Sequence, residues 1–289
     1  MSTVYLDGSY LPKAEARVSV DDRGFLFSDG VYEVTAAYGG RLFRFEKHLE
    51  RMRSGLAALR IDFDPSELRQ IKEELLARNG LAEAEAAYVY VQVTRGAAPR
   101  SHAFPRVDAT PTVYAFANRY ERPERDRWEK GFRAITVPDM RWARVDIKAI
   151  SLLPNVLAQQ AAVDAGVDDA IYVRDGIAME GAHNNLFAVF EGMVVTAPKS
   201  NYILHGISRD VVIGLAHDLG IPVEERSIPV GDLYQADEIF FTGTTTEVRP
   251  TVEVDGRRIG DGTVGPVSTR LFDAFLAATV SQGVEAASA

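Results

Sequence analysis

The sequence has no cysteine among its 289 residues, which excludes disulfide bonds, thiolate metal sites and cysteine nucleophiles. It also lacks an excess of basic residues. The formal net charge is −9, and this balance argues against nucleic acid as a partner. No apolar run approaches the length of a membrane span, and no signal-peptide pattern opens the chain. We therefore expect a cytoplasmic protein without a membrane partner.

Several familiar catalytic patterns are also missing. The five histidines include no pair at the helical spacing of metal ligands, so no metal is expected. There is no Gly-x-Ser-x-Gly elbow, no Walker motif and no dinucleotide-binding glycine fingerprint. What remains is an ordinary globular composition, 46% hydrophobic and 25% charged, in a chain long enough for two packed domains.

Hydrophobic periodicity predicts an N-terminal α+β domain at residues 1–117, followed by a charge-rich linker at 118–129. Within this domain, a hairpin is expected to turn at Asp7-Gly8, and residues 22–30 are expected to form a glycine-containing aromatic loop. Further strands are predicted at residues 31–38, 41–45, 88–94 and 112–117, and helices at residues 46–60 and 65–78.

The larger C-terminal domain is predicted at residues 130–289. Because most of its strands are joined by short hairpins, a long parallel sheet is not expected. The predicted fold class is therefore mixed α and β. The expected helices lie at 152–165, with Pro154 in the first turn, at 208–220 and after Ser268. The expected strands lie at 132–137, 170–174, 177–180, 186–190, 194–196 and 238–242.

One lysine stands in unusually apolar surroundings. Lys148 lies between Ile147 and Ile150, with Leu152 and Leu153 just beyond. A partly buried lysine has its charged form disfavoured, and its neutral amine can attack a carbonyl to form a Schiff base. The alternative is a lysine whose stem packs against apolar side chains while its ammonium group reaches water. On this stretch alone, the second interpretation is the commoner one.

Two hydroxyl-bearing turns can bind an anion. Gly206 and Ser208 precede a predicted helix, whose first N–H groups and dipole favour negative charge. The turn Gly243-Thr244-Thr245 follows a predicted strand, and Arg51 offers a fixed positive charge on the helix from residue 46. The alternatives are plain helix capping, a locally bonded turn and a solvated arginine. With Lys148, these groups indicate a phosphorylated aldehyde cofactor such as pyridoxal 5′-phosphate.

Such a cofactor needs a carboxylate beside its pyridine nitrogen, because the ring withdraws electrons well only while that nitrogen stays protonated. Glu180 is the candidate. It ends the uncharged run Ile177-Ala178-Met179 at the close of a predicted strand. The alternative, a strand-terminal acid that faces water, is about equally common on local grounds.

Residues 94–102 form a candidate substrate-binding loop. This glycine- and proline-containing segment carries Arg100 and His102. An arginine fork together with a histidine N–H can bind a carboxylate. Tyr32, which follows Asp29-Gly30, could add a phenol. The alternative is an exposed basic loop without a ligand.

Together these segments resemble the fold-type IV pyridoxal-phosphate aminotransferases, and within that class the D-amino acid aminotransferases. The resemblance runs from about residue 3 to about residue 275, with the motifs in family order. The segments that carry it are Asp22-Arg23-Gly24-Phe25 with Asp29-Gly30-Val31-Tyr32-Glu33, Val93-Thr94-Arg95-Gly96 with Pro99-Arg100-Ser101-His102, Asp146-Ile147-Lys148, Glu180-Gly181 with Asn185-Leu186-Phe187, and Gly206-Ile207-Ser208-Arg209.

The resemblance implies a two-domain fold with pyridoxal 5′-phosphate at the domain cleft, held mainly by the C-terminal domain. Lys148 would form the internal aldimine, and Glu180 would hold the proton on the pyridine nitrogen. The implied phosphate ligands and ring contact are Arg51, Ser208, Thr244, the backbone of Ile207, and Leu204, which would pack against the ring.

The implied reaction is transamination of D-amino acids with 2-oxo acids, of the D-alanine and 2-oxoglutarate type, with Lys148 moving the proton. Tyr32, Arg100 and His102 resemble the family's trap for the substrate carboxylate. The family is homodimeric and part of that trap crosses the interface, so an isolated monomer should be inactive. Amino acids, keto acids and a second copy of the chain are thus the expected partners.

The chain departs from the family pattern in three places. Ala182-His183-Asn184 stands where small hydroxylated residues are expected, so His183 is expected to alter the surroundings of the cofactor or its water path. Gly243 replaces an expected serine, and one phosphate hydrogen bond is in doubt. Ala36 replaces a lysine of well-known members, so charge at the pocket mouth and substrate range can differ.

Other functions remain within the same fold: a branched-chain L-amino acid aminotransferase, an (R)-amine transaminase and an aminodeoxychorismate lyase. The Arg100 and His102 loop favours D-amino acids over each of them. A different class of protein is a cofactor-free binding or scaffold protein, in which Lys148 is a satisfied core lysine. A yellow colour of the purified protein would distinguish the enzyme from the scaffold.

Overall fold

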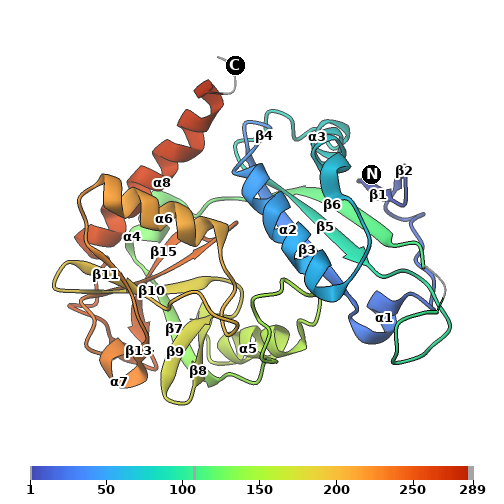
Figure 1. Cartoon of the computed structure of the whole chain (residues 1–289). Helices are drawn as coiled ribbons and strands as arrows, with labels where there is room; N and C mark the ends of the chain where they lie inside the picture. The colour runs from blue at the N-terminus through green and yellow to red at the C-terminus, as the bar shows by residue number, and fades with distance from the viewer. Residues whose placement is uncertain (1, 107–108, 286–289) are drawn as a thin grey trace. The chain divides into compact units, whose positions relative to one another are not determined.

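The computed structural model describes residues 2–106 and 109–285. The chain divides into two compact units, one formed by Met1–Glu121 with Ile147–Ser151 and the other by Arg122–Asp146 with Leu152–Ala289. Each unit has its own sheet and its own apolar core (Figure 1). The predicted mixed α and β class is confirmed. The segment around Lys148 belongs to the first unit, whereas the expected division assigns it to the C-terminal domain.

Among the described residues, the sheet of the first unit has six strands in the order β2-β1-β6-β5-β3-β4, all antiparallel to their neighbours. The hairpin at Asp7-Gly8 and the three long strands are confirmed. The return strand expected at 41–45 is shorter, because a helix begins at Phe45. The bounds are β1 Thr3–Leu6, β2 Ser9–Pro12, β3 Gly30–Tyr38, β4 Arg41–Leu42, β5 Ala87–Thr94 and β6 Thr112–Arg119.

Two helices, α2 (Phe45–Leu59) and α3 (Leu68–Arg78), pack against this sheet (Figure 1). The helix predicted at 46–60 is confirmed. The second is preceded by a 3-10 turn, η1 (Pro65–Glu67), because the Asp64 carboxylate caps the chain there by accepting the Ser66 N–H at 3.0 Å. The shared core includes Leu49, Met52 and Leu56 of α2, Leu75 and Leu76 of α3, and Val89, Val91 and Val93 of β5.

The loop expected at residues 22–30 is a wrong prediction in part, because it contains the short helix α1 (Arg23–Phe27). Asp22 caps this helix by accepting the Gly24 N–H at 2.7 Å. Gly24 is required by close packing, since an added Cβ would lie 2.2 Å from the Thr94 side chain. The two aromatic residues and two glycines of residues 22–30 favoured a loop, whereas the Asp22 cap starts a short helix.

As far as the structure describes the chain, the second sheet has ten strands in the order β12-β11-β10-β14-β15-β7-β8-β9-β13, with β16 paired to β15. Only the pairs β7–β8, β7–β15 and β11–β12 are parallel, so the expectation of no long parallel sheet is confirmed. The bounds are β7 Phe132–Pro138, β8 Asp169–Arg174, β9 Ile177–Gly181, β10 Asn185–Phe190, β11 Met193–Thr196, β12 Val223–Glu225, β13 Ile228–Pro229, β14 Glu238–Gly243, β15 Glu247–Val254 and β16 Arg257–Arg258.

Helices cover this second sheet as well, with α5 against β7 and β8, and α6 and α8 against β14. Pro154 lies in the first turn of α5, as predicted. None of the helices that the structure describes is long and apolar enough to cross a membrane. The helices are α4 Arg125–Glu129, α5 Leu153–Asp164, α6 Ile207–Asp218, α7 Val230–Leu233 and α8 Pro266–Glu285.

The helix α4 lies inside the stretch that the sequence treats as a linker. Its Trp128 is 1% exposed, stacks on Phe272 with ring centroids 4.2 Å apart, and donates its indole N–H to the Val248 carbonyl at 2.8 Å. These contacts fasten residues 125–129 to the second unit.

Candidate active site

Lys148 lies at the centre of a tight turn in the first unit. The Ala149 N–H donates to the Ile147 carbonyl at 2.7 Å, which closes a three-residue turn around the lysine. Ile147 and Ala149 are buried in the apolar core of this unit, whereas Lys148 is only partly buried. The alternation therefore directs the lysine side chain away from that core, and Lys148 is not a satisfied core lysine.

The backbone of this turn is held against the start of β3. The Tyr32 N–H donates to the Lys148 carbonyl at 3.0 Å, and the Ile150 N–H donates to the Gly30 carbonyl at 3.1 Å. Gly30 has to be a glycine, because an added Cβ would lie 2.6 Å from the Val93 carbonyl oxygen. The sequence Gly30-Val31-Tyr32 thus fixes the position of the lysine.

Tyr32 and Lys148, both predicted site residues, are brought together by this pairing. The Lys148 Nζ lies 4.2 Å from the centroid of the Tyr32 ring, a distance at which an ammonium group is attracted to the ring face. The Tyr32 ring also stacks on Tyr90, with ring centroids 5.5 Å apart and 25° between the planes. Ala36 is on the same face of β3 as Tyr32 and is 2% exposed.

Arg51 is held by a carboxylate that the sequence analysis overlooked. Its Nε and Nη2 donate to the two oxygens of Glu33, at 3.0 and 2.6 Å. The His48 Nδ1 lies 3.0 Å from Glu33 Oε1. A signal for this pair was available in the sequence, because Glu33 interrupts the inward-facing positions of a predicted strand.

Arg100 and His102 come together around a different aromatic ring. The Arg100 guanidinium lies 5.2 Å from the centroid of Phe27, and the His102 ring lies 5.5 Å from it. Both residues are exposed. The structure thus groups this pair with α1, while Tyr32 is grouped with Lys148.

Ion pairs fasten the loop of Arg100 to α1. Asp29 accepts from Arg23 Nε at 2.8 Å and from Arg95 Nε at 2.8 Å. The same Arg23 donates from Nη1 to the Ser101 carbonyl at 2.6 Å. Burial raises the pKa of Asp29, but the hydrogen bonds and charges of Arg95 and Arg23 outweigh it and lower that pKa. The loop is therefore anchored on both sides of Arg100.

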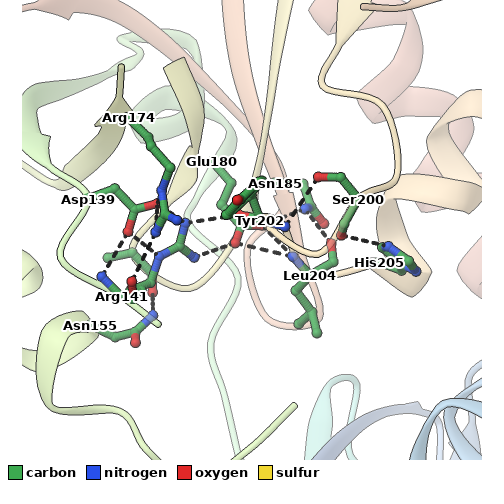
Figure 2. A network of polar contacts seen from close by, with 11 residues as sticks. Asp139, Arg141, Asn155, Arg174, Glu180, Asn185, Ser200, Tyr202, Leu204 and His205 are labelled. Atoms are coloured by element: carbon green, nitrogen blue, oxygen red, sulfur yellow. Dashed lines mark hydrogen bonds and ion pairs between the residues drawn. The ribbon is translucent and has the colours of Figure 1, made fainter. Parts of the chain in front are cut away.

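Glu180 lies at the end of β9, in the second unit, with its carboxylate buried in a polar network (Figure 2). Its oxygens accept the Leu204 N–H at 3.1 and 3.2 Å and the Asn185 amide at 2.9 Å. Arg141 Nη1 donates to Glu180 Oε1 at 2.5 Å. The carboxylate therefore has fixed partners and a defined orientation.

Arg141 is the cation that makes this burial tolerable. Burial raises the pKa of Glu180 to about 7, and the Arg141 charge and hydrogen bond oppose that rise. Asp139 in turn accepts Arg141 Nε at 2.9 Å and Nη2 at 3.0 Å. The guanidinium also lies 4.0 Å from the Tyr172 ring centroid. A cationic ring nitrogen beside Glu180 would favour its ionised form further.

The backbone beside Glu180 is held in place by Asn185. Its side-chain amide donates both to Glu180 Oε2 and to the Leu204 carbonyl, the latter at 2.8 Å. The loop that contains Leu204 is closed by His205, whose Nε2 lies 3.1 Å from the Ser200 carbonyl (Figure 2). Leu204 and Glu180, both predicted site residues, are thus neighbours.

The first turn of α6 has the donors that an anion site needs. Gly206 is the N-cap and no side chain caps the helix, so its first N–H groups are not used for capping. Ser208 is buried in this turn, next to Ile207. A side chain at Gly206 would displace the Asn185 amide, because a Cβ would lie 1.9 Å from Asn185 Oδ1. The predicted phosphate ligands Ile207 and Ser208 therefore adjoin the Glu180 network.

Thr244 lies in the turn between β14 and β15, as predicted. Gly243 is the last residue of β14, just before this turn, and a Cβ there would meet Thr246 Oγ1 at 3.1 Å and the Asn184 Cβ at 3.4 Å. Asn184 is buried and donates to Asp169 at 2.6 Å. Two of the departures from the family pattern, Gly243 and Asn184, therefore lie near each other, and a serine at 243 would be crowded by Thr246.

The other two residues of the segment Ala182-His183-Asn184 differ in their surroundings. Ala182 is buried, and its carbonyl accepts the Asn155 amide at 2.6 Å. The neighbouring His183 is exposed. The expected influence of His183 on the cofactor thus remains a prediction.

The donor set of the second unit suits a phosphorylated pyridine cofactor. A helix N-terminus with a buried serine fits a phosphate, and a buried carboxylate fits a protonated ring nitrogen. The first unit, taken by itself, has a lysine on a tight turn and an arginine of fixed orientation. These are the groups that pyridoxal phosphate requires.

Comparison with known proteins agrees with this chemistry. The model of the family "Amino-transferase class IV" matches residues 30–254. The chain belongs to this family. It is 41% identical over 277 residues to a D-alanine aminotransferase from Staphylococcus haemolyticus, covering 95% of this chain and 97% of that protein. A D-alanine aminotransferase from Bacillus licheniformis is 37% identical over 96% of this chain and 98% of its own length.

Solved class IV structures share the fold. A branched-chain amino acid aminotransferase of a T.th. strain, solved with pyridoxamine 5′-phosphate, has a TM-score of 0.88 and 32% identity, over 97% of this chain and 95% of that one. The branched-chain enzyme of Escherichia coli has a TM-score of 0.84 and 27% identity, over 95% and 92%. The predicted fold-type IV architecture is therefore confirmed.

Sequence reasoning missed the residues that support the site. Arg141 and Asp139 sit in an irregular segment where no periodicity or motif marks them. Asn185 belongs to a segment that carried the family resemblance, but its amide had no assigned role. These side chains hold Glu180 and Leu204, and their role becomes visible only when β9, β10 and the loop before α6 are placed together.

Proposed function

We propose that this class IV aminotransferase transfers amino groups from D-amino acids to 2-oxo acids with pyridoxal 5′-phosphate. The observation that carries the proposal is the similarity to D-alanine aminotransferases over nearly the whole length of both chains. When bound, the cofactor supplies an aldehyde that accepts the amino group and a ring that withdraws electrons from the substrate Cα. The residues of this chain bind and orient the cofactor and the substrate, and they move protons.

Lys148 has two tasks in this proposal. Its amine would attach covalently to the cofactor between turnovers, and when free it would act as the base that takes up the Cα proton of the substrate and gives it back. The tight turn at Ile147–Ala149 limits where the Nζ can reach. The Tyr32 ring, 4.2 Å from that atom, bounds its movement on one side.

Glu180 would keep the ring nitrogen protonated, and the charge and hydrogen bond of Arg141 favour the ionised form of Glu180 against its burial. The Asn185 amide and the Leu204 N–H hold the carboxylate in one orientation, while the Leu204 side chain packs on the ring. For the phosphate we propose the N–H of Ile207 and the side chains of Ser208, Thr244 and Arg51. The joining of these groups around one cofactor is part of the proposal.

Handedness follows from where the substrate carboxylate is bound. The substrate Cα–H has to face Lys148, so its carboxylate can lie on only one of two sides of the ring. A cationic clamp on one side then selects one enantiomer. We assign this clamp to Arg100 and His102, aided by Tyr32, and we infer a preference for D-amino acids.

A branched-chain L-amino acid aminotransferase is the second candidate, because the two solved relatives above act on branched-chain amino acids by name. The (R)-amine transaminases and aminodeoxychorismate lyases of the same fold are further alternatives. An exposed arginine and histidine on one anchored loop favour a substrate with a carboxylate at that position. A variant of Arg100 distinguishes these functions.

Arg100→Ala is expected to lower kcat/KM for D-alanine by about one to two powers of ten, since a hydrogen bond to a charged group contributes about 1.5–3 kcal/mol. An (R)-amine without a carboxylate should change by less than about threefold, because it makes no such bond. The matched control is Arg119→Ala, an exposed arginine at the end of β6. An equal loss on amine and amino acid would contradict the assignment.

We also propose that the enzyme is a cytoplasmic homodimer whose substrate trap is shared between chains. The arrangement of the first unit supports this, because Arg100 and His102 group around Phe27 rather than Tyr32. The helix α5 supplies an uncharged apolar surface for a second copy of the chain. Leu153, Val156 and Leu157 of this helix are 59–69% exposed.

Subunit mixing tests the shared trap. Chains carrying Lys148→Ala, expected to be inactive on D-alanine, and chains carrying Arg100→Ala, expected to keep only a small residual activity, are unfolded together and refolded. If the trap crosses the interface, half of the dimers are mixed and one of their two sites is intact, so about one quarter of wild-type activity should return. Recovery no greater than the sum of the two separate variants would place the trap within one chain.

A further inference from the structure

The first unit contains charged residues in an apolar core. Residues 31, 33, 35 and 37 of β3 share one face of the strand, and Val31 and Ala37 belong to the core against α2 and α3. Between them lie Glu33, 1% exposed, and Thr35, 0% exposed. A buried carboxylate without partners is strongly disfavoured, so Glu33 must be compensated by its neighbours.

Arg51 and His48 provide that compensation from adjacent turns of α2. Arg51 donates from Nε at 3.0 Å and from Nη2 at 2.6 Å, which occupies both Glu33 oxygens and fixes the plane of the guanidinium. The His48 Nδ1 lies 3.0 Å from Glu33 Oε1, and the Val34 N–H donates to the same oxygen at 3.1 Å. The Arg51 side chain, 11% exposed, is thus held at one edge in a nearly dry environment.

The histidine acts as a neutral donor in this cluster. Burial lowers the pKa of His48 to about 4, although Glu33 opposes the shift. A carboxylate can only accept, so the neutral ring must carry its proton on Nδ1 and donate it to Glu33. Burial raises the pKa of Glu33, but Arg51 and His48 outweigh it and hold that pKa well below its usual range. Glu33 therefore stays ionised and keeps its ion pair with Arg51.

A second cation lies behind this pair. Lys72 of α3 is 1% exposed, donates to Thr35 Oγ1 at 2.5 Å and lies 5.7 Å from the Phe45 ring centroid. Burial lowers the pKa of Lys72 to about 8, so it is mainly charged at neutral pH. Lys72 thus places a second positive charge near the pair of Glu33 and Arg51.

We propose that Glu33 and His48 are positioning residues that orient the Arg51 guanidinium for the phosphate of the cofactor. The inference rests on the proposed function, in which Arg51 is a phosphate ligand. A free arginine side chain has many rotamers, and an arginine already held at one edge loses less entropy when it binds. The role of Glu33 and His48 is thus to preorganise a ligand that they do not replace.

The test compares pyridoxal phosphate with pyridoxal, which lacks the phosphate. Cofactor-free full-length protein is titrated with each compound, and the absorbance of the lysine-bound form gives two dissociation constants. Glu33→Gln should weaken pyridoxal phosphate about tenfold or more, as expected for loss of a charge-assisted hydrogen bond, and change pyridoxal by less than about twofold. His48→Leu should act in the same direction, and His48→Asn, which keeps a donor near Nδ1, should restore most of the affinity.

The control is Glu46→Gln on the same helix, whose carboxylate is 72% exposed and pairs with Arg69 at 2.8 Å. If Glu33→Gln and His48→Leu leave the ratio of the two constants unchanged, or weaken both compounds alike, the positioning role is wrong. If Glu33→Gln does not fold, the pair His48→Leu and His48→Asn decides by the same ratio.

A parallel variant separates this inference from the proposed site. Arg51→Met should abolish the advantage of pyridoxal phosphate over pyridoxal. The ratio meant here is the dissociation constant of pyridoxal divided by that of pyridoxal phosphate. If Arg51→Met lowers this ratio while Glu33→Gln and His48→Leu do not, Arg51 is the phosphate ligand and only the positioning role is overturned. If Arg51→Met leaves the ratio unchanged, Arg51 is not a phosphate ligand, and both the inference and that part of the site are overturned.

Discussion

Replacement of Lys148 by alanine is expected to abolish transamination while the protein stays folded. The lysine is both the nucleophile and the base in the proposed reaction, and loss of a general base alone costs about two to four powers of ten in rate. The side chain is only partly buried and leads away from the core, so its removal leaves Ile147 and Ala149 in place. The measurement is kcat with D-alanine and 2-oxoglutarate, with the melting temperature recorded alongside.

Borohydride reduction of the holoenzyme identifies the lysine directly. Peptide mapping should find the reduced cofactor on Lys148 in the wild type and no labelled peptide in Lys148→Ala. The matched control is Lys199→Ala, whose side chain is 44% exposed and pairs with Asp210 at 2.9 Å. A label on another lysine, or near wild-type turnover in Lys148→Ala, would remove Lys148 from the centre of the mechanism.

Glu180→Gln is expected to retain the cofactor and lose most of the rate. A neutral amide cannot hold the proton on the ring nitrogen, so electrons are withdrawn less well from the substrate Cα. Loss of a hydrogen bond between charged groups costs about 1.5–3 kcal/mol, or about one to two powers of ten in kcat. The proposed phosphate ligands are unchanged, and the affinity for the cofactor should fall much less.

Two readouts distinguish this role from simple loss of structure. The absorbance spectrum of bound cofactor should change in Glu180→Gln, because the protonation of the ring changes. Glu224→Gln, a carboxylate that is 47% exposed and pairs with Arg226 at 2.8 Å, should leave spectrum and rate as in the wild type. Unchanged turnover together with an unchanged spectrum in Glu180→Gln would exclude Glu180 from the site.

Local sequence patterns predicted the regular elements well where one physical rule dominated. The spacing of Leu49, Met52 and Leu56 identified α2, and the alternation in residues 31–38 identified β3. β15 was missed because Pro250 argues against a strand, yet this proline occupies a position in the ladder opposite Phe240. The cap at Asp22 was likewise outweighed by the glycines and aromatic residues around it.

The candidate site divides in the same way. Lys148, Glu180 and Ser208 could be proposed from their residue types and neighbours, because each would carry the chemistry itself. Their supports were not found, because Arg141 and Glu33 act through contacts between segments that are distant in sequence. The assignment of Ile147–Ser151 to the first unit also depends on such contacts, here with the start of β3. A long-range pair leaves no periodic trace in the chain.

A single half-reaction shows whether the enzyme prefers D-amino acids over L-amino acids. The holoenzyme is mixed with D-alanine and separately with L-alanine, without a keto acid, and conversion of the cofactor to its aminated form is followed by absorbance. The account predicts conversion with D-alanine at least about tenfold faster than with L-alanine, because the wrong enantiomer leaves the carboxylate clamp unpaired. Equal rates, or faster conversion with L-alanine, would contradict it.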